Sequence, residues 1–135
     1  MRIKLDEGAF VPERSHPMDA GLDLKTPIKF NIPPKNHISI NTGVHVEIPE
    51  GYVGLITSKS GLMLKGITSR GTIDSSYRGP IYAVLYNDSP EWVHFKVGDK
   101  ITQLVILPCW IKDVEVVEEL SQTDRGENGF GSTGR

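Results

Sequence analysis

The chain has 135 residues, of which 38% are hydrophobic and 24% charged, and its formal net charge at pH 7 is −2. This length predicts one domain with its own core, and the composition excludes a wholly disordered chain. No apolar run reaches the roughly 18 residues of a transmembrane helix, and no basic stripe typical of nucleic-acid binders is visible. We therefore expect neither a membrane nor a nucleic acid as partner.

The cellular compartment is suggested by cysteine usage and by the first residues. The single cysteine, Cys109, excludes an intramolecular disulfide. The stretch from Met1 to Glu7 contains no apolar signal core. We expect a cytoplasmic protein in which Cys109 is a small buried hydrophobic residue.

In the first half of the chain, short strands are expected. The 14 glycines and 9 prolines are typical of many strands joined by turns. Alternating apolar residues predict strands over residues 35–40 and 43–49, and β-branched and aromatic residues predict a strand over 52–57. One helix-like window, residues 60–65, is too short to be stable without packing.

The second half continues this pattern. The apolar run 80–87 predicts a strand buried on both faces, and residues 92–95 are expected to pair with it across a turn. Residues 101–107 predict a strand that ends at Pro108. Residues 111–120 fit a helix or a strand, and their β-branching favours a strand. We interpret Trp92 and Trp110 as core or subunit-interface residues.

The last residues differ in composition from the rest. Residues 122–135 are rich in Gly, Ser, Thr and Asn, which predicts a mobile tail after a β-rich core domain of residues 1–121. We expect an all-β fold, with jelly-roll or barrel closure disposing of the sheet edges.

Four polar clusters are candidates for chemistry. In the first, Asp19 and Asp23 bracket Gly21. Carboxylate oxygens suit a hard cation such as Mg²⁺, often through retained waters. The alternative is a tight turn in which the aspartates bond backbone amides.

The second cluster, residues 57–62, lies where a strand leads into the helix-like window. Hydroxyls, Lys59 and amides at a helix start favour an anion site. The alternative is a serine N-cap. No Walker A motif is present in the sequence.

The third cluster, residues 71–79, lies between strand candidates. Asp74 on a turn suits a general base that orients a water, and Tyr77 offers a flat face to a ring. The alternative is a hairpin turn in which Asp74 and Ser75 satisfy the local backbone.

The fourth cluster is the tail itself, where glycines flank Phe130. Arg125 and the downstream hydroxyls suit phosphate oxygens. The pattern favours a lid that orders over a nucleotide, and the alternative is a solvated tail.

Taken in order, the clusters resemble the five motifs of the trimeric deoxyuridine triphosphatase (dUTPase) family, and the resemblance runs from about residue 17 to the end. The motifs match residues 20–24, 59–62, 71–79, 98–104 and 125–134. The resemblance implies a jelly-roll-like subunit in a homotrimer with active sites shared between subunits. It also implies hydrolysis of dUTP to dUMP and pyrophosphate with Mg²⁺, which keeps uracil out of DNA and supplies dUMP for thymidylate synthesis.

The resemblance also implies roles for individual residues. Asp74 would orient the attacking water, Tyr77 would leave no room for a ribose 2′-hydroxyl, and Asp23 would hold Mg²⁺ through water. The other substrate-binding residues would be Gly71, Ile73 and Tyr82 at the uracil, Lys59, Ser60, Gly61 and Gln103 at the phosphates, and Arg125, Phe130, Gly131, Ser132 and Thr133 in the tail.

Departures from the family pattern and two alternatives complete the sequence argument. Lys59 stands where the family commonly has arginine, so charge is kept but the bidentate fork is lost. A deoxycytidine triphosphate deaminase shares the fold, but Val84 occupies the position where that family looks to need a glutamate. A non-catalytic trimeric binding scaffold is disfavoured by the joint presence of Asp74, Tyr77, Gln103 and Phe130.

Overall fold

The computed structural model describes residues 1–129, which form nine β-strands and one single-turn helix. The elements are β1 Arg2–Leu5, β2 Gly21–Lys25, β3 Phe30–Ile32, β4 Asn36–Glu47, β5 Tyr52–Thr57, α1 Ser60–Met63, β6 Ile67–Ile73, β7 Pro80–Asn87, β8 Val93–Phe95 and β9 Lys100–Pro108. The all-β expectation is confirmed, and the two strands predicted over residues 35–49 are one long strand, β4.

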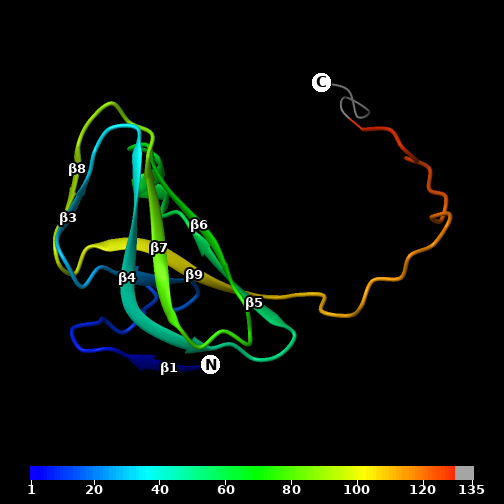
Figure 1. Ribbon diagram of the computed structural model, residues 1–135, viewed down its shortest axis with the longest axis horizontal. Helices are drawn as coiled ribbons and strands as arrows, with labels where there is room; N and C mark the ends of the chain where they lie inside the picture. The colour runs from blue at the N-terminus through cyan, green and yellow to red at the C-terminus, as the bar shows by residue number, and fades with distance from the viewer. Residues whose placement is uncertain (130–135) are drawn as a thin grey trace.

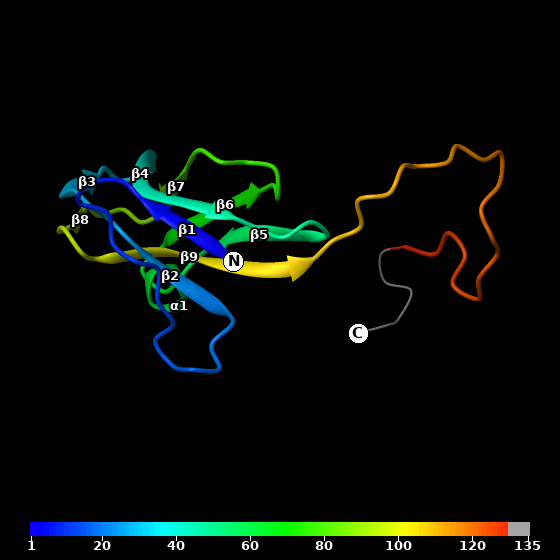
Figure 2. The same ribbon diagram turned by 90° about the horizontal axis from the view of Figure 1, so that it is seen from below.

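Seven strands form one antiparallel sheet in the order β1-β4-β7-β6-β5-β9-β2, and β3 pairs with β8 in a separate ribbon. The sheet curls strongly, so β4 and β7 face β9 across the interior (Figures 1 and 2). This curled, jelly-roll-like sheet matches the fold class expected from the sequence. Strand β9 lies between β5 and β2 and pairs with both of them.

The core fills the inside of the curl in two clusters. One lies around Leu24, Val44 and Leu104, and the other lies around Ile40 and Ile101. Strand β7 contributes alternate residues to them, as a half-buried strand does. The expectation that β7 is buried on both faces is therefore wrong for this chain, since its other face includes the exposed Tyr82.

The expected pairing of residues 92–95 with β7 is also wrong. Strand β8 pairs with β3, and Phe95 stacks on Phe30 with ring centroids 4.7 Å apart. The cause is the fully buried Asn87, whose side-chain amide donates to the carbonyls of Ile32, Pro33 and Glu91. These bonds redirect the chain toward β3 at the end of β7.

Residues 111–120 form no strand, contrary to the expectation from their β-branching. Both edges of β9 are already paired, with β5 and β2, so the chain that follows it finds no free strand beside it. It leaves the body in an extended path (Figure 1). Trp92 and Trp110 are exposed, which rules out the core, and Cys109 is half-buried rather than buried.

None of the helical residues within 1–129 forms a segment long and apolar enough to cross a membrane.

Candidate active site

A cavity of about 430 Å³ lies where β2, β9 and the start of α1 meet. We call it the β2–β9 cleft. Its lining includes Asp23, Lys59, Ser60 and Gln103, so it brings residues of three predicted motifs together. The sheet register explains this meeting, because Gln103 of β9 pairs with Asp23 on one side and with Thr57 on the other.

Asp23 is the central charge of the cleft and is only 3% exposed. Its carboxylate forms ion pairs with Lys59 and, at 2.8 Å, with Lys100, and it accepts a hydrogen bond from the Ser15 hydroxyl at 2.9 Å. Burial raises the pKa of Asp23, but the hydrogen bonds from Lys100, Lys59 and Ser15 outweigh burial and leave the pKa below its usual value. The cleft therefore holds an ionised carboxylate between two cations.

Asp23 lies in β2 and not in a turn. Asp19, the other aspartate of the first cluster, does serve the backbone as the turn alternative suggests. Its carboxylate accepts hydrogen bonds from the amide and ring nitrogen of His16, while it also lines the cleft.

The residues at the start of α1 present polar groups to the cleft. Lys59 is the N-cap, and no side-chain cap is formed, so the serine N-cap alternative is wrong. Ser60 and Gly61 are exposed at the first turn, and a Cβ on Gly61 would meet nothing within 4 Å. This open approach suits a ligand with several anionic oxygens.

The side chain of Gln103, from β9, lies over Gly21 of β2, which has no side chain to obstruct it. A Cβ on Gly21 would lie 2.1 Å from Oε1 of Gln103. The amide nitrogen of Gln103 donates to the carbonyl of Ser58 at 3.1 Å. The glycine of the first motif therefore makes room for the glutamine of the fourth.

The remaining predicted groups of the body lie on the hairpin formed by β6 and β7. Gly71 and Ile73 are in β6, Tyr82 is in β7, and Asp74–Gly79 connect the strands as a loop that we call the hairpin loop. Asp74 and Tyr77 are exposed in it.

The hairpin loop is closed by its own hydrogen bonds. The amide of Tyr77 donates to the carbonyl of Asp74 at 3.0 Å, and the Tyr77 hydroxyl donates to the carbonyl of Pro80 at 3.0 Å. A Cβ on Gly79 would lie 2.2 Å from this hydroxyl, so the tyrosine folds over a glycine. The loop thus presents an aromatic face beside a free carboxylate.

The hairpin loop and the β2–β9 cleft lie apart in one chain. Ile73 pairs with Gly54, whereas Gln103 pairs with Thr57, three residues further along β5. At about 3.4 Å per residue, Asp74 is at least about 10 Å along the sheet from the cleft. In Figure 2, α1 lies beside β2 while the β6–β7 connection lies on the other side of β9.

The tail is described only in part. The exposed side chain of Arg125 donates to the carbonyl of Asn128 at 3.0 Å, in a segment that runs away from the body (Figure 1). Four predicted substrate-binding residues, Phe130, Gly131, Ser132 and Thr133, lie outside the described residues.

Two partners of Asp23 were not assigned a role from the sequence. Lys100 belongs to the fourth motif, but its ion pair with Asp23 becomes evident only from the pairing of β9 with β2. Ser15 lies in an irregular loop and gives no sequence signal at all.

Comparison with known proteins adds independent findings. The family model of the dUTPases matches residues 7–134. Deoxyuridine 5′-triphosphate nucleotidohydrolases of Clostridium novyi and Corynebacterium jeikeium are 43% and 41% identical, over 97% and 98% of this chain and 95% and 90% of their own lengths.

Solved structures agree with the sequence relatives. The dUTPase of Staphylococcus bacteriophage 80alpha with dUpNHpp has a TM-score of 0.92 and 34% identity, covering 99% of this chain and 98% of its own. A mutant dUTPase of phage phi11 of S. aureus, described with a structural Mg(II) ion, has a TM-score of 0.81 and 33% identity, covering 87% and 96%.

Proposed function

This chain belongs to the dUTPase family and hydrolyses dUTP, and from this premise we propose that it binds the two ends of its substrate in two different places. The triphosphate occupies the β2–β9 cleft, and the deoxyuridine lies on the hairpin. The observation that carries this proposal is that the cleft and the hairpin offer different chemical groups. The cleft offers Lys59, Ser60 and Gln103, whereas the hairpin offers an aromatic face and a carboxylate.

We infer that a complete site forms between copies in a homotrimer. Within residues 1–129 of one copy, the cleft and the hairpin loop lie on opposite sides of β9 (Figure 2), and the strand positions beside them are three residues apart along β5. The exposed Tyr82 and the extended segment after β9 are consistent with surfaces that neighbouring copies cover. In such a site, the tail would bind the γ-phosphate and the uracil. The tail residues concerned are Arg125, Phe130, Gly131, Ser132 and Thr133.

The donor set of the cleft fits Mg²⁺ held through water. Within residues 1–129, no three His, Cys, Asp or Glu side chains are grouped as a metal cage. Both oxygens of Asp23 are already engaged by Lys59, Lys100 and Ser15, so Asp23 would hold the ion through its water shell and not by a direct bond. A hydrated Mg²⁺ needs only one or two carboxylates together with phosphate oxygens. When bound, it neutralises charge on the triphosphate.

In the reaction, Asp74 orients a water and takes a proton from it. The water oxygen bonds to the α-phosphorus while the bond from that phosphorus to the bridging oxygen breaks, and pyrophosphate leaves. Gln103 binds the α-phosphate, and Lys59, Ser60 and Gly61 bind the phosphates beyond it. Tyr77 packs under the sugar and excludes a 2′-hydroxyl. Backbone groups of Gly71 and Ile73, together with Tyr82, bind the uracil edge. The same backbone forms a rigid wall, and such a wall excludes the thymine methyl better than an adaptable apolar pocket does.

Pyrophosphate release with Mg²⁺ from dUTP, dTTP, dCTP and UTP in parallel tests this assignment. We expect fast release from dUTP alone. Comparable release from UTP would contradict the role of Tyr77, and release from dTTP would contradict the uracil-reading hairpin. No release from any of the four by folded protein would contradict the activity itself.

A further inference from the structure

His45 lies at the base of the hairpin loop. On β4 it pairs with Lys4 of β1 on one side and with Pro80, the first residue of β7, on the other. The register of β4 and β7 shifts between Asn41 and His45, where Gly43 adopts a φ of +68° that favours glycine. This irregularity sets His45 beside the residues that end the hairpin loop.

The imidazole of His45 faces a hydrogen-bond acceptor on each side. Its Nδ1 lies 2.8 Å from the carbonyl oxygen of Arg78, and its Nε2 lies 3.0 Å from a carboxylate oxygen of Asp6. A carbonyl oxygen can only accept, so the contact at Nδ1 is a hydrogen bond that the ring donates. The side chain is 16% exposed, which limits competition from water.

Asp6 is itself fixed to the body. Its amide donates to the carbonyl of Gly43 at 2.8 Å, and its own carbonyl accepts from the amide of Ala9 at 3.1 Å. A Cβ on Gly43 would lie 2.8 Å from the Cβ of Ala9, so the loop after β1 packs tightly on β4. The carboxylate that orients His45 therefore has a defined position.

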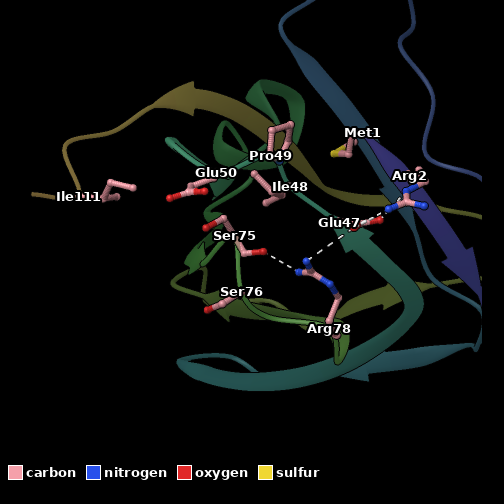
Figure 3. Close-up of a pocket in the computed structure, with 10 residues that line it drawn as sticks. All are labelled: Met1, Arg2, Glu47, Ile48, Pro49, Glu50, Ser75, Ser76, Arg78 and Ile111. Carbon is pink, nitrogen blue, oxygen red and sulfur yellow. Dashed lines mark hydrogen bonds and ion pairs between the residues drawn. The ribbon is translucent and has the colours of Figure 1, made fainter.

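Arg78 connects this point to the sugar-facing residues. Its guanidinium donates to the carbonyls of Ser75 at 2.5 Å and Tyr77 at 2.9 Å, and Figure 3 shows it reaching toward both Ser75 and Glu47. The hairpin loop is thus closed on itself, and the bond from His45 to the Arg78 carbonyl fastens the closed loop to β4.

We propose that His45 is a positioning residue for the dUTPase reaction, whose Nδ1–H sets where Tyr77 stands against the sugar. The inference rests on the proposed function, in which Tyr77 excludes the ribose 2′-hydroxyl. His45 acts through the Arg78 carbonyl and does not touch substrate. The charged groups that surround it are Asp6, Arg2 and Lys4 from the N-terminal segment, Glu47 from β4, and Arg78 from the hairpin loop.

A matched pair of variants separates the two bonds of His45. The amide nitrogen of His45→Asn lies near the place of Nδ1 and still donates to the Arg78 carbonyl, whereas that of His45→Gln lies near the place of Nε2, toward Asp6. The readout is kcat/KM for dUTP divided by kcat/KM for UTP. We expect His45→Asn to keep the wild-type ratio and His45→Gln to lower it about 10-fold, the effect of one lost hydrogen bond.

Two further variants complete the design. His45→Ala, which loses both bonds, should lower the ratio as far as His45→Gln does. His94→Ala removes a histidine on β8 that bonds Asn31, and it should leave the ratio unchanged. A purely structural role would lower both nucleotides' rates together, so an unchanged ratio in His45→Gln and His45→Ala would overturn the inference.

Asp74→Asn distinguishes failure of this inference from failure of the proposed function. If Asp74→Asn hydrolyses dUTP at the wild-type rate, the proposed role of Asp74 in the hairpin loop is overturned, and the role of His45, which rests on that assignment, is overturned with it. If Asp74→Asn is inactive and the His45→Asn and His45→Gln ratios agree, only the role of His45 is overturned.

Discussion

At the scale of single residues, the structure leaves Asp74 free for chemistry. Its backbone carbonyl closes the hairpin loop by accepting from Tyr77, while its side chain is exposed. An amide side chain fits the same space but cannot take a proton from water. Asp74→Asn should therefore keep the wild-type melting temperature and lose about 10²- to 10⁴-fold in kcat. A kcat within a few-fold of wild type, measured by pyrophosphate release, would contradict its role as general base.

The ion pairs of Asp23 make a second residue-scale prediction, on stability. Because its pKa in the folded protein is lowered from 3.8, the ionised form stabilises the fold at pH values above about 3.8, and this contribution is lost as the pH falls through the lower folded-state value. Asp23→Asn should lower the free energy of unfolding at pH 7 by about 1–3 kcal/mol.

The difference between wild type and Asp23→Asn should shrink as the pH falls below about 3.8, because the wild-type carboxyl then loses its charge as well. Denaturant unfolding at several pH values measures it. A difference that stays constant down to pH 3 would show that the ion pairs of Asp23 are not its source.

At the scale of elements, the contact of β2 with β9 depends on Gly21. In Gly21→Ala, the new methyl would meet the Gln103 side chain at 2.1 Å, and the Gln103 amide must leave its bond to Ser58. We expect kcat/KM for dUTP to fall about 10-fold, as for one lost polar contact.

A double-mutant cycle checks this cause. In a Gln103→Ala background the two nearest atoms are gone and only the 3.3 Å approach to the Cβ of residue 103 remains, so adding Gly21→Ala should change kcat/KM little further. Equal losses from Gly21→Ala in both backgrounds would show that the glycine is needed for another reason.

The same scale shows how far sequence patterns predict elements. Local composition is enough to locate two central strands: β5 from its β-branched and aromatic residues and β7 from its apolar run. The partner of β8 cannot be predicted from local sequence, because it depends on the buried Asn87. The amide of Asn87 donates to two carbonyls more than 50 residues earlier in the chain and to that of Glu91, beyond the next turn. Residues 111–120 have strand propensity, but both edges of β9, the strand that they follow, are already paired, and propensity alone does not supply a partner.

The site shows the same limit. The motifs gave Asp23, Lys59 and Gln103 as candidates, and their meeting in one cleft follows from the register of β2, β9 and β5. Lys100 and Ser15 complete the set of groups that bind the Asp23 carboxylate, yet neither can be assigned before the strand pairing is known. Which motifs share a cleft is a property of topology and not of spacing along the chain.

At the scale of the whole molecule, residues 122–129 of the tail are exposed and lie outside the core that stabilises the fold. All buried residues of the two core clusters lie between Leu24 and Leu104. Deleting Arg125 to Arg135 should therefore leave a protein that melts normally but hydrolyses dUTP poorly. An unchanged kcat/KM would mean that the tail takes no part in the active site.

At this scale we propose that each active site is shared between two copies of the chain, and mixing two defective variants tests this sharing. Asp74→Asn damages the hairpin half and Asp23→Asn damages the cleft half, so each variant alone should be nearly inactive. If the halves of a site come from different copies, oligomers formed from equal amounts of both variants restore about a quarter of the sites by random assembly. If each site lay within one chain, every site would carry a defect, and activity no higher than that of the separate variants would contradict the account.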